Sequence, residues 1–317
     1  MTKKKKTSNQ STEKLLAKLT KELKAQNFKT DEELNEYLQE NIMGNELDFD
    51  EGGELTNAQK AQDLVWDAWE LEYADDRIEL ALQALKLDKN CADAYNLLAA
   101  DKAQNYLEIL NYYLKAIKAG KESLGKEFEE LKGAFWGFHQ TRPYMRAMDG
   151  LANTYLHSNQ IQKAIDTWKE MLELNPNDNQ GVRYSLITAL LSVKKFKDVE
   201  KLINDYEDDA SATWLYSKAY LFFNQKSKKP LATKALVKAM LFNPYVPLYI
   251  FSIREMPDEL PEYVGSGDEN EAIEYVDSAI YLWGENKRAF IWLSNIYGKN
   301  ADDLEMLIIE REKERDS

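Results

Sequence analysis

The sequence is poor in the residues that carry metal and nucleophilic chemistry. Its 317 residues contain one cysteine, Cys91, and two histidines, His139 and His157. A single cysteine excludes a disulfide within the chain and a cluster of thiolates around zinc. The spacing suggests no Ser-His-Asp or Cys-His arrangement, so little remains for nucleophilic catalysis. We therefore expect a protein that is not an enzyme and that holds no metal and no cofactor.

Long apolar runs and an excess of positive charge are also missing. No segment approaches the ~18 apolar residues that a membrane-spanning helix needs, and no apolar segment of a secretory signal follows the first lysines. Acidic residues number 55 against 41 basic ones, a formal net charge of −14, which repels nucleic-acid phosphates. The sequence predicts a cytoplasmic protein that neither spans a membrane nor binds nucleic acid.

What the sequence does contain is a helical repeat. The tetratricopeptide pattern is W-x2-L-G-x2-Y, then A-x3-F, then P, over ~34 residues. Small residues in it sit where two helices approach closely, and large ones fill the space around them. One match comprises Met148, Leu151, Ala152, Tyr155, Ala164, Trp168 and Pro176; two periods later another comprises Tyr216, Ala219, Tyr220, Phe223, Ala232, Leu236 and Pro244.

A degenerate repeat fits between these two, with Leu186, Leu190, Val199 and Ile203 in register if one loop residue slips. Three consecutive hairpins on one period predict an all-α fold, a right-handed superhelix of the tetratricopeptide type. The predicted parts are a disordered basic tail (1–11), a helical segment with an acidic linker (12–57), the repeat solenoid (58–298) and a charged C-terminal helix (299–317).

An insert near 119–142 interrupts the solenoid and either extends a helix or packs over the repeats. It opens with Gly120-Lys121-Glu122-Ser123-Leu124-Gly125-Lys126, most of a phosphate-binding loop. That motif needs Ser or Thr next and a strand before it, whereas Glu127 follows and a helix precedes. We interpret Gly120 instead as a helix-ending glycine.

The acidic stretch Asp48–Gly53 hints at a calcium loop. Its fifth ligand position is Gly52, and its twelfth is Gln59 rather than a bidentate glutamate. A solvated acidic linker is the better interpretation.

Five segments together resemble a known family, the suppressor of tumorigenicity protein 7 family and its uncharacterised bacterial tetratricopeptide relatives. They are 90–99 (NCADAYNLLA), 114–120 (LKAIKAG), 205–209 (DYEDD), 243–249 (NPYVPLY) and 267–273 (GDENEAI). Their order and spacing look like the soluble repeat region of that family over roughly residues 60–285. The resemblance implies an α-helical repeat fold without catalytic activity.

In such solenoids the first helix of each repeat lines a concave groove that holds a segment of a partner protein. The repeat register gives seven candidate contacts: Arg146, Asp149, Asn153, Tyr184, Thr188, Trp214 and Lys218. Asp149 stands where repeats that clamp a C-terminal carboxylate carry lysine, so we expect no binding of acidic C-terminal peptides.

The sequence predicts a scaffold or adaptor with a protein or peptide partner. Two alternatives stay open: an enzyme that uses the 119–142 insert around His139, and a nucleic-acid or membrane-surface binder that uses the basic N-terminus.

Overall fold

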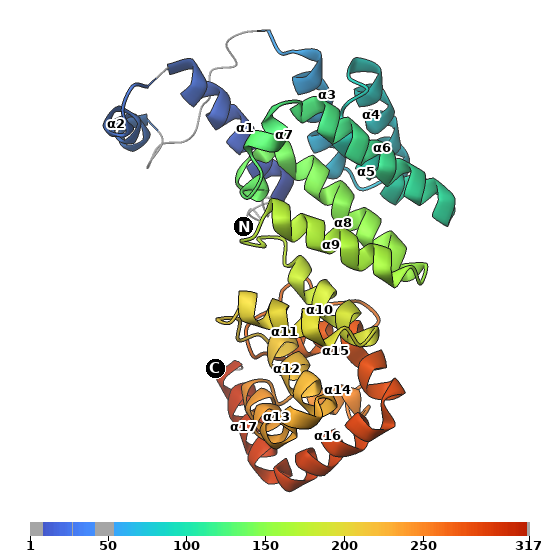
Figure 1. The fold of residues 1–317 in the computed structure, drawn as a ribbon. Helices are drawn as coiled ribbons and strands as arrows, with labels where there is room; N and C mark the ends of the chain where they lie inside the picture. Colours follow the sequence, from blue (N-terminus) through green and yellow to red (C-terminus); the bar gives the residue numbers. More distant parts are fainter. Residues whose placement is uncertain (1–8, 27, 42–53, 316–317) are drawn as a thin grey trace. The chain divides into compact units, whose positions relative to one another are not determined.

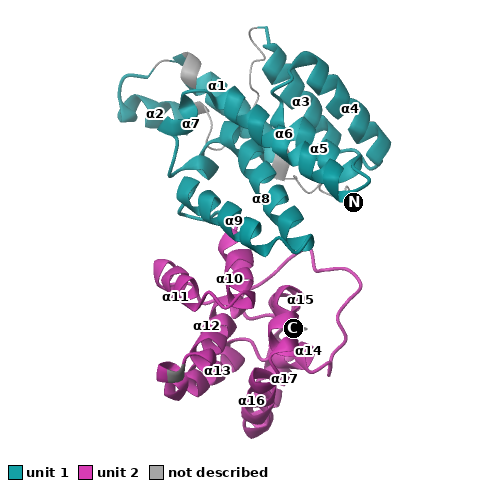
Figure 2. Cartoon of the chain, turned by 45° about the vertical axis from the view of Figure 1, so that its right-hand side comes forward, with its two compact units in different colours: residues 1–180 teal, residues 181–317 magenta. Residues whose placement is uncertain are grey.

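The computed structural model describes residues 9–26, 28–41 and 54–315 (Figure 1). Within these residues every regular element is helical and no strand occurs, so the predicted all-α class is confirmed. The chain forms two compact units, residues 1–180 and 181–317, coloured separately in Figure 2. The predicted domain bounds remain a prediction. Most of the basic tail and of the acidic linker, including the calcium-like stretch Asp48–Gly53, lies outside the described residues.

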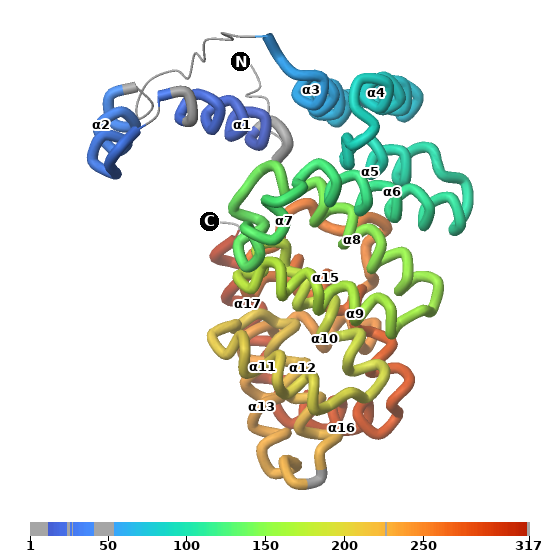
Figure 3. Tube along the Cα trace, turned by 45° about the horizontal axis from the view of Figure 1, so that its top comes forward, coloured from blue at the N-terminus to red at the C-terminus, as the bar shows by residue number. Residues whose placement is uncertain are grey.

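Unit 1 consists of successive helices, most of which pack against their neighbours in the chain. They are α1 (Asn9–Gln26), α2 (Asp31–Asn41), α3 (Asn57–Trp69), α4 (Ala74–Leu87), α5 (Ala92–Asp101), α6 (Tyr106–Leu124), α7 (Glu127–Glu130), the 3-10 turns η1 (Phe135–Gly137) and η2 (His139–Thr141), α8 (Arg142–His157) and α9 (Ile161–Leu174). Consecutive pairs, α3 with α4, α5 with α6 and α8 with α9, make the main contacts (Figure 3). Helix α1 packs against α3 and η2.

Small residues stand where the paired helices meet. Ala81 and Ala84 of α4, Ala152 of α8 and Ala164 of α9 are fully buried. Larger neighbours such as Trp168 are buried beside them. The sequence spacing of small and large residues therefore corresponds to real helix contacts.

Unit 2 continues the helical pairing. It contains α10 (Val182–Ser192), α11 (Phe196–Asp205), α12 (Ala212–Asn224), η3 (Lys226–Lys228), α13 (Lys229–Phe242), α14 (Val246–Ile250), α15 (Glu269–Glu285), α16 (Lys287–Lys299) and α17 (Ala301–Arg315). Its core holds Tyr216 stacked on Tyr275 with ring centroids 5.4 Å apart. The indole of Trp283 donates a hydrogen bond to the Tyr275 hydroxyl at 2.9 Å.

The predicted insert extends helix α6 and then packs against α8. Helix α6 runs through Gly120 and ends only at Gly125, whose φ is +53°, so the interpretation of Gly120 as a helix end is wrong. Gly120 is glycine for a packing reason, because a Cβ there would lie 3.1 Å from the Tyr144 Cβ. After the turn, Phe128 packs edge-on against Phe135 and Tyr144.

The Asn-Pro-Tyr-Val-Pro segment anchors the second unit. The buried Asn243 side chain donates to the Glu271 carboxylate at 3.0 Å, and the backbone carbonyl of Asn243 accepts a hydrogen bond from the Tyr216 hydroxyl at 2.9 Å. Glu271 also accepts from the Gly267 backbone at 2.8 Å. These bonds tie the end of α13 to the start of α15 across a long loop.

Candidate interaction site

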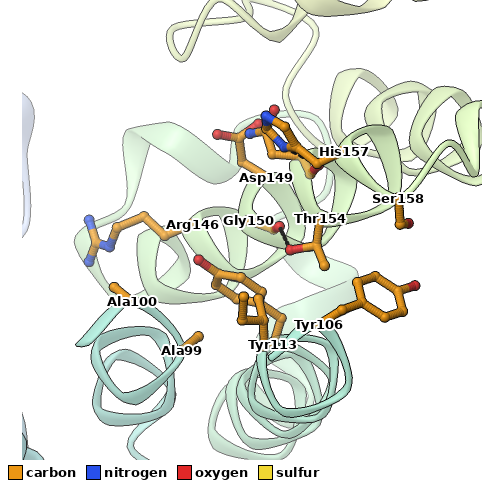
Figure 4. Close-up of a pocket in the computed structure, with 12 residues that line it drawn as sticks. Ala99, Ala100, Tyr106, Tyr113, Arg146, Asp149, Gly150, Thr154, His157 and Ser158 are labelled. Carbon is orange, nitrogen blue, oxygen red and sulfur yellow. Dashed lines mark hydrogen bonds between the residues drawn. The ribbon is translucent and has the colours of Figure 1, made fainter. Parts of the chain in front are cut away.

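A pocket of about 830 Å³ lies within unit 1 between α5, α6 and α8 (Figure 4). Its lining mixes small, aromatic and polar side chains: Ala99, Ala100, Tyr106, Ile109, Tyr113, Arg146, Asp149, Gly150, Asn153, Thr154, His157 and Ser158. One helix, α8, supplies the polar side, while α5 and α6 supply most of the apolar side. A mixed, concave surface of this kind suits a segment of another protein.

The polar side of the pocket follows from helical spacing. Arg146, Asp149 and Asn153 are separated by three and four residues, which places them on one face of α8. The structure brings these three predicted contacts together in the pocket. Tyr113, from α6, was not among the predicted contacts; its ring extends toward α8 (Figure 4). Sequence inspection could have found it only through Gly150, which leaves room for that ring.

Asp149 is a partly buried acid in this pocket. Burial raises the pKa of its carboxyl, against the opposing effect of hydrogen bonds from Trp168 and Asn153. The Trp168 indole nitrogen lies 3.2 Å from the Asp149 Oδ1. Burial, together with the negative charge of Asp149, also raises the pKa of Tyr113. The pocket therefore presents an acceptor beside a neutral phenol.

Arg146 is not a free cation, because two carboxylates bind it. Its Nε and Nη2 donate to the buried Asp93 at 3.0 and 2.6 Å, and its Nη1 and Nη2 donate to Glu13 of α1 at 2.7 and 3.0 Å. The guanidinium also stacks over the Trp69 ring, 5.1 Å from its centroid. Burial alone would lower the pKa of Arg146, but Asp93 and Glu13 outweigh it and the pKa is raised.

The other four predicted contacts belong to unit 2. Tyr184 donates to Asp209 at 2.9 Å, Thr188 is 4% exposed, and Trp214 is 2% exposed. Trp214 packs edge-on against Tyr184 and Tyr206, so its indole contributes to the core. Lys218 is exposed on the surface of α12.

The two histidines considered for catalysis or metal binding lie at helix ends. His157 lies at the end of α8, where its Nδ1 is 2.7 Å from the Asn153 carbonyl oxygen, and His139 lies in η2. In the described part of the chain, no three His, Cys, Asp or Glu side chains are grouped so that they could hold a metal ion. Among the same residues, no helix has both the length and the apolar character to cross a membrane.

Comparison with known proteins relates the chain to one family. A family model described as "ST7 protein" matches residues 49–308. "Suppressor of tumorigenicity 7 protein-like" of Gallus gallus is 25% identical over 252 residues, covering 72% of this chain and 45% of that protein. The human protein of that description is 24% identical over 246 residues, covering 68% and 41%. "Protein ST7 homolog" of Caenorhabditis elegans is 24% identical over 268 residues, covering 73% and 49%.

The chain thus spans less than half the length of these curated relatives. The family model, in contrast, matches most of the chain, from the segment before α3 into α17. The expected resemblance is confirmed: the chain belongs to the ST7 family.

Proposed function

We propose that this chain is a non-catalytic scaffold or adaptor that binds a segment of another protein in the pocket of unit 1. The observation that carries the proposal is that Arg146, Asp149 and Asn153, chosen from the repeat register, line one pocket together. Helical repeats use such faces for extended or helical segments of partners. The pocket is large enough for several side chains of a partner rather than one.

We also propose a cellular location and exclude one class of partner. The net charge of −14 argues against nucleic acid as the partner. The single, unpaired and buried Cys91 suits a reducing compartment, so we place the protein in the cytoplasm.

Acidic C-terminal peptides are not the proposed ligand. Asp149 would repel a terminal carboxylate in the pocket, and Lys218 belongs to the other unit. Titration of a labelled acidic C-terminal peptide should therefore show no micromolar binding. Such binding, lost in Lys218→Ala, would contradict the expectation.

The test of the scaffold function is affinity capture from native cytoplasm with a blocked pocket. Ala100 is exposed and both it and Asn153 line the pocket, so Ala100→Arg with Asn153→Arg fills the pocket, and neither residue is a partner in the Arg146 ion pairs. Leu82→Arg, at an exposed position of α4 outside the pocket, is the matched control. Circular dichroism should show that all variants keep their helices.

We expect the wild type and Leu82→Arg to retain a partner that the blocked variant loses. If all three retain the same proteins, the pocket is not the binding site. If none retains any protein, the scaffold proposal loses its support, and screens for enzymatic activity become the next step.

A further inference from the structure

Helix α1 places one buried carboxylate, Glu13, against the rest of unit 1. Among the α1 side chains that the structure describes, Glu13 alone is buried, at 4% exposed. Leu15 is 39% exposed, and Leu16, Leu19 and Leu23 are partly exposed. Glu13 is thus the most fully buried of the described α1 side chains, whereas Leu16, Leu19 and Leu23 are half-buried.

The site that receives Glu13 is built for a negative charge. Arg146 binds both Glu13 oxygens, and Arg142 Nη1 lies 3.5 Å from Oε1. Arg142 is itself positioned by donating to the Trp136 carbonyl and by stacking over the Trp136 ring. Arg146 also binds Asp93, whereas the ion pair given for Arg142 is with Glu13, so among the described residues the two guanidiniums carry one surplus positive charge when Glu13 is absent. A bidentate arginine–carboxylate pair is the strong and geometrically selective form of this interaction.

A second ion pair lies beside the first. Here α1 contributes the positive charge and α3 the negative one. Lys14 Nζ, from the residue after Glu13, lies 2.7 Å from Asp67 Oδ1 of α3. The Asp67 side chain is 59% exposed, so the pair contributes little energy and favours a positive charge at this position only modestly. Together the two pairs recognise the adjacent sequence Glu-Lys on one helix.

We propose that Arg142, Arg146 and Asp67 form a receptor for an amphipathic helix that carries an adjacent Glu-Lys pair. Helix α1 occupies this receptor within the same molecule, and a partner helix with the same pair takes its place. Arg146 also lines the pocket described above, so the helix receptor and the pocket share this residue. The proposal takes its biological role from the proposed scaffold function, yet it can be tested without any outside partner.

A helix tethered to its own site competes at an effective concentration in the millimolar range. For an intrinsic dissociation constant of about 10–100 μM, the tethered α1 would weaken binding of a free helix about 10- to 100-fold. Removing the tethered competitor should therefore strengthen binding of a free α1 peptide by that factor.

The experiment uses the full chain and a fluorescent synthetic peptide of residues 9–26. In Glu13→Lys, an ammonium would face two guanidiniums, so α1 should leave the receptor while Arg146 keeps Asp93. Fluorescence anisotropy should show the peptide binding Glu13→Lys about 10- to 100-fold more tightly than the wild type. Glu32→Lys, which makes the same charge change at an exposed position of α2, should behave as the wild type. A Glu13→Gln peptide should not bind.

A charge exchange tests the second pair. A Lys14→Glu peptide should bind Glu13→Lys more weakly than the native peptide does, and adding Asp67→Lys to the protein should restore its binding.

The proposal would be overturned if the peptide bound the wild type and a folded Glu13→Lys variant with equal affinity. It would also be overturned if the peptide bound neither protein. A wild-type dimer that becomes monomeric in Glu13→Lys would overturn the intramolecular version, because α1 would then sit on a second copy. If the peptide binds as expected but affinity capture retains no partner, the result contradicts the scaffold function and still supports the helix receptor.

Discussion

Tyr113 of α6 lies so close to Gly150 of α8 that no side chain fits between them. A Cβ at residue 150 would lie 2.3 Å from the Tyr113 Cε1 and Cζ atoms. Glycine at this helical position therefore lets α6 and α8 approach beside the pocket. The contact sets the position of the phenol that faces Asp149.

Replacement of Gly150 by alanine should consequently destabilise unit 1. The added methyl must displace the Tyr113 ring, which we expect to lower the free energy of unfolding by about 1–3 kcal/mol. Gly284→Ala in α15 is the matched control, because nothing lies within 4 Å of a Cβ there and helix propensity should stabilise it by about 0.5–1 kcal/mol. Urea unfolding followed by circular dichroism measures both. Equal effects of the two substitutions would contradict the close contact.

Glu271→Gln should destabilise unit 2. The carboxylate accepts hydrogen bonds from the backbone nitrogens of Ala212 and Gly267 and from the Asn243 side chain, at 3.0, 2.8 and 3.0 Å. The NH2 group of a glutamine side chain would face at least one of these N–H groups instead of accepting its hydrogen bond, and the remaining bonds would no longer involve a charged acceptor. We expect the free energy of unfolding to fall by about 2–4 kcal/mol. Glu305→Gln, at an exposed position of α17, should change stability by less than about 0.5 kcal/mol. A comparably small loss in Glu271→Gln would mean that the network does not hold α13 to α15.

Cys91 should be unreactive in the folded protein. Burial, helped by the nearby negative charge of Asp93, raises the pKa of the Cys91 thiol to about 12, so thiolate is scarce at pH 8. Reaction with Ellman's reagent should be at least about 100-fold slower in buffer than in denaturing urea. A Cys91→Ser/Ala100→Cys double variant moves the thiol to an exposed position and should react promptly. Fast labelling of the native wild type would show that α5 opens readily.

Asp149 should make stability depend on pH. Because burial raises the pKa of Asp149, the folded chain binds this proton more tightly than the unfolded chain does. The contribution of this group to stability is thus greatest at low pH and declines as the pH rises through the folded pKa. Asp149→Asn keeps an acceptor for the Trp168 indole and removes the ionisation.

We therefore expect Asp149→Asn to gain stability relative to the wild type at pH 7, and to lose that advantage as the pH falls toward the ordinary aspartate range. Unfolding in urea between pH 4 and 7.5 measures the difference. A difference that grows toward acid would contradict the raised pKa.

Much of the fold could be read from local patterns. The helical segment expected from residue 12 corresponds to α1 (Asn9–Gln26) and α2 (Asp31–Asn41). Gly120 was misjudged because a glycine that ends a helix and one that accommodates a neighbouring helix look alike in sequence. Only the packing of Tyr144 against it separates the two cases.

The sequence by itself determined the all-α class, the helix pairs and the shared face of Arg146, Asp149 and Asn153, because each depends on periodicities within a few turns of helix. The tertiary structure alone decided that Trp214 is buried, that Tyr113 meets Gly150 and that Glu13 occupies the arginine site. Glu13 and Arg146 are 133 positions apart. No local pattern records which distant carboxylate will neutralise a buried guanidinium; that choice depends on where each helix docks.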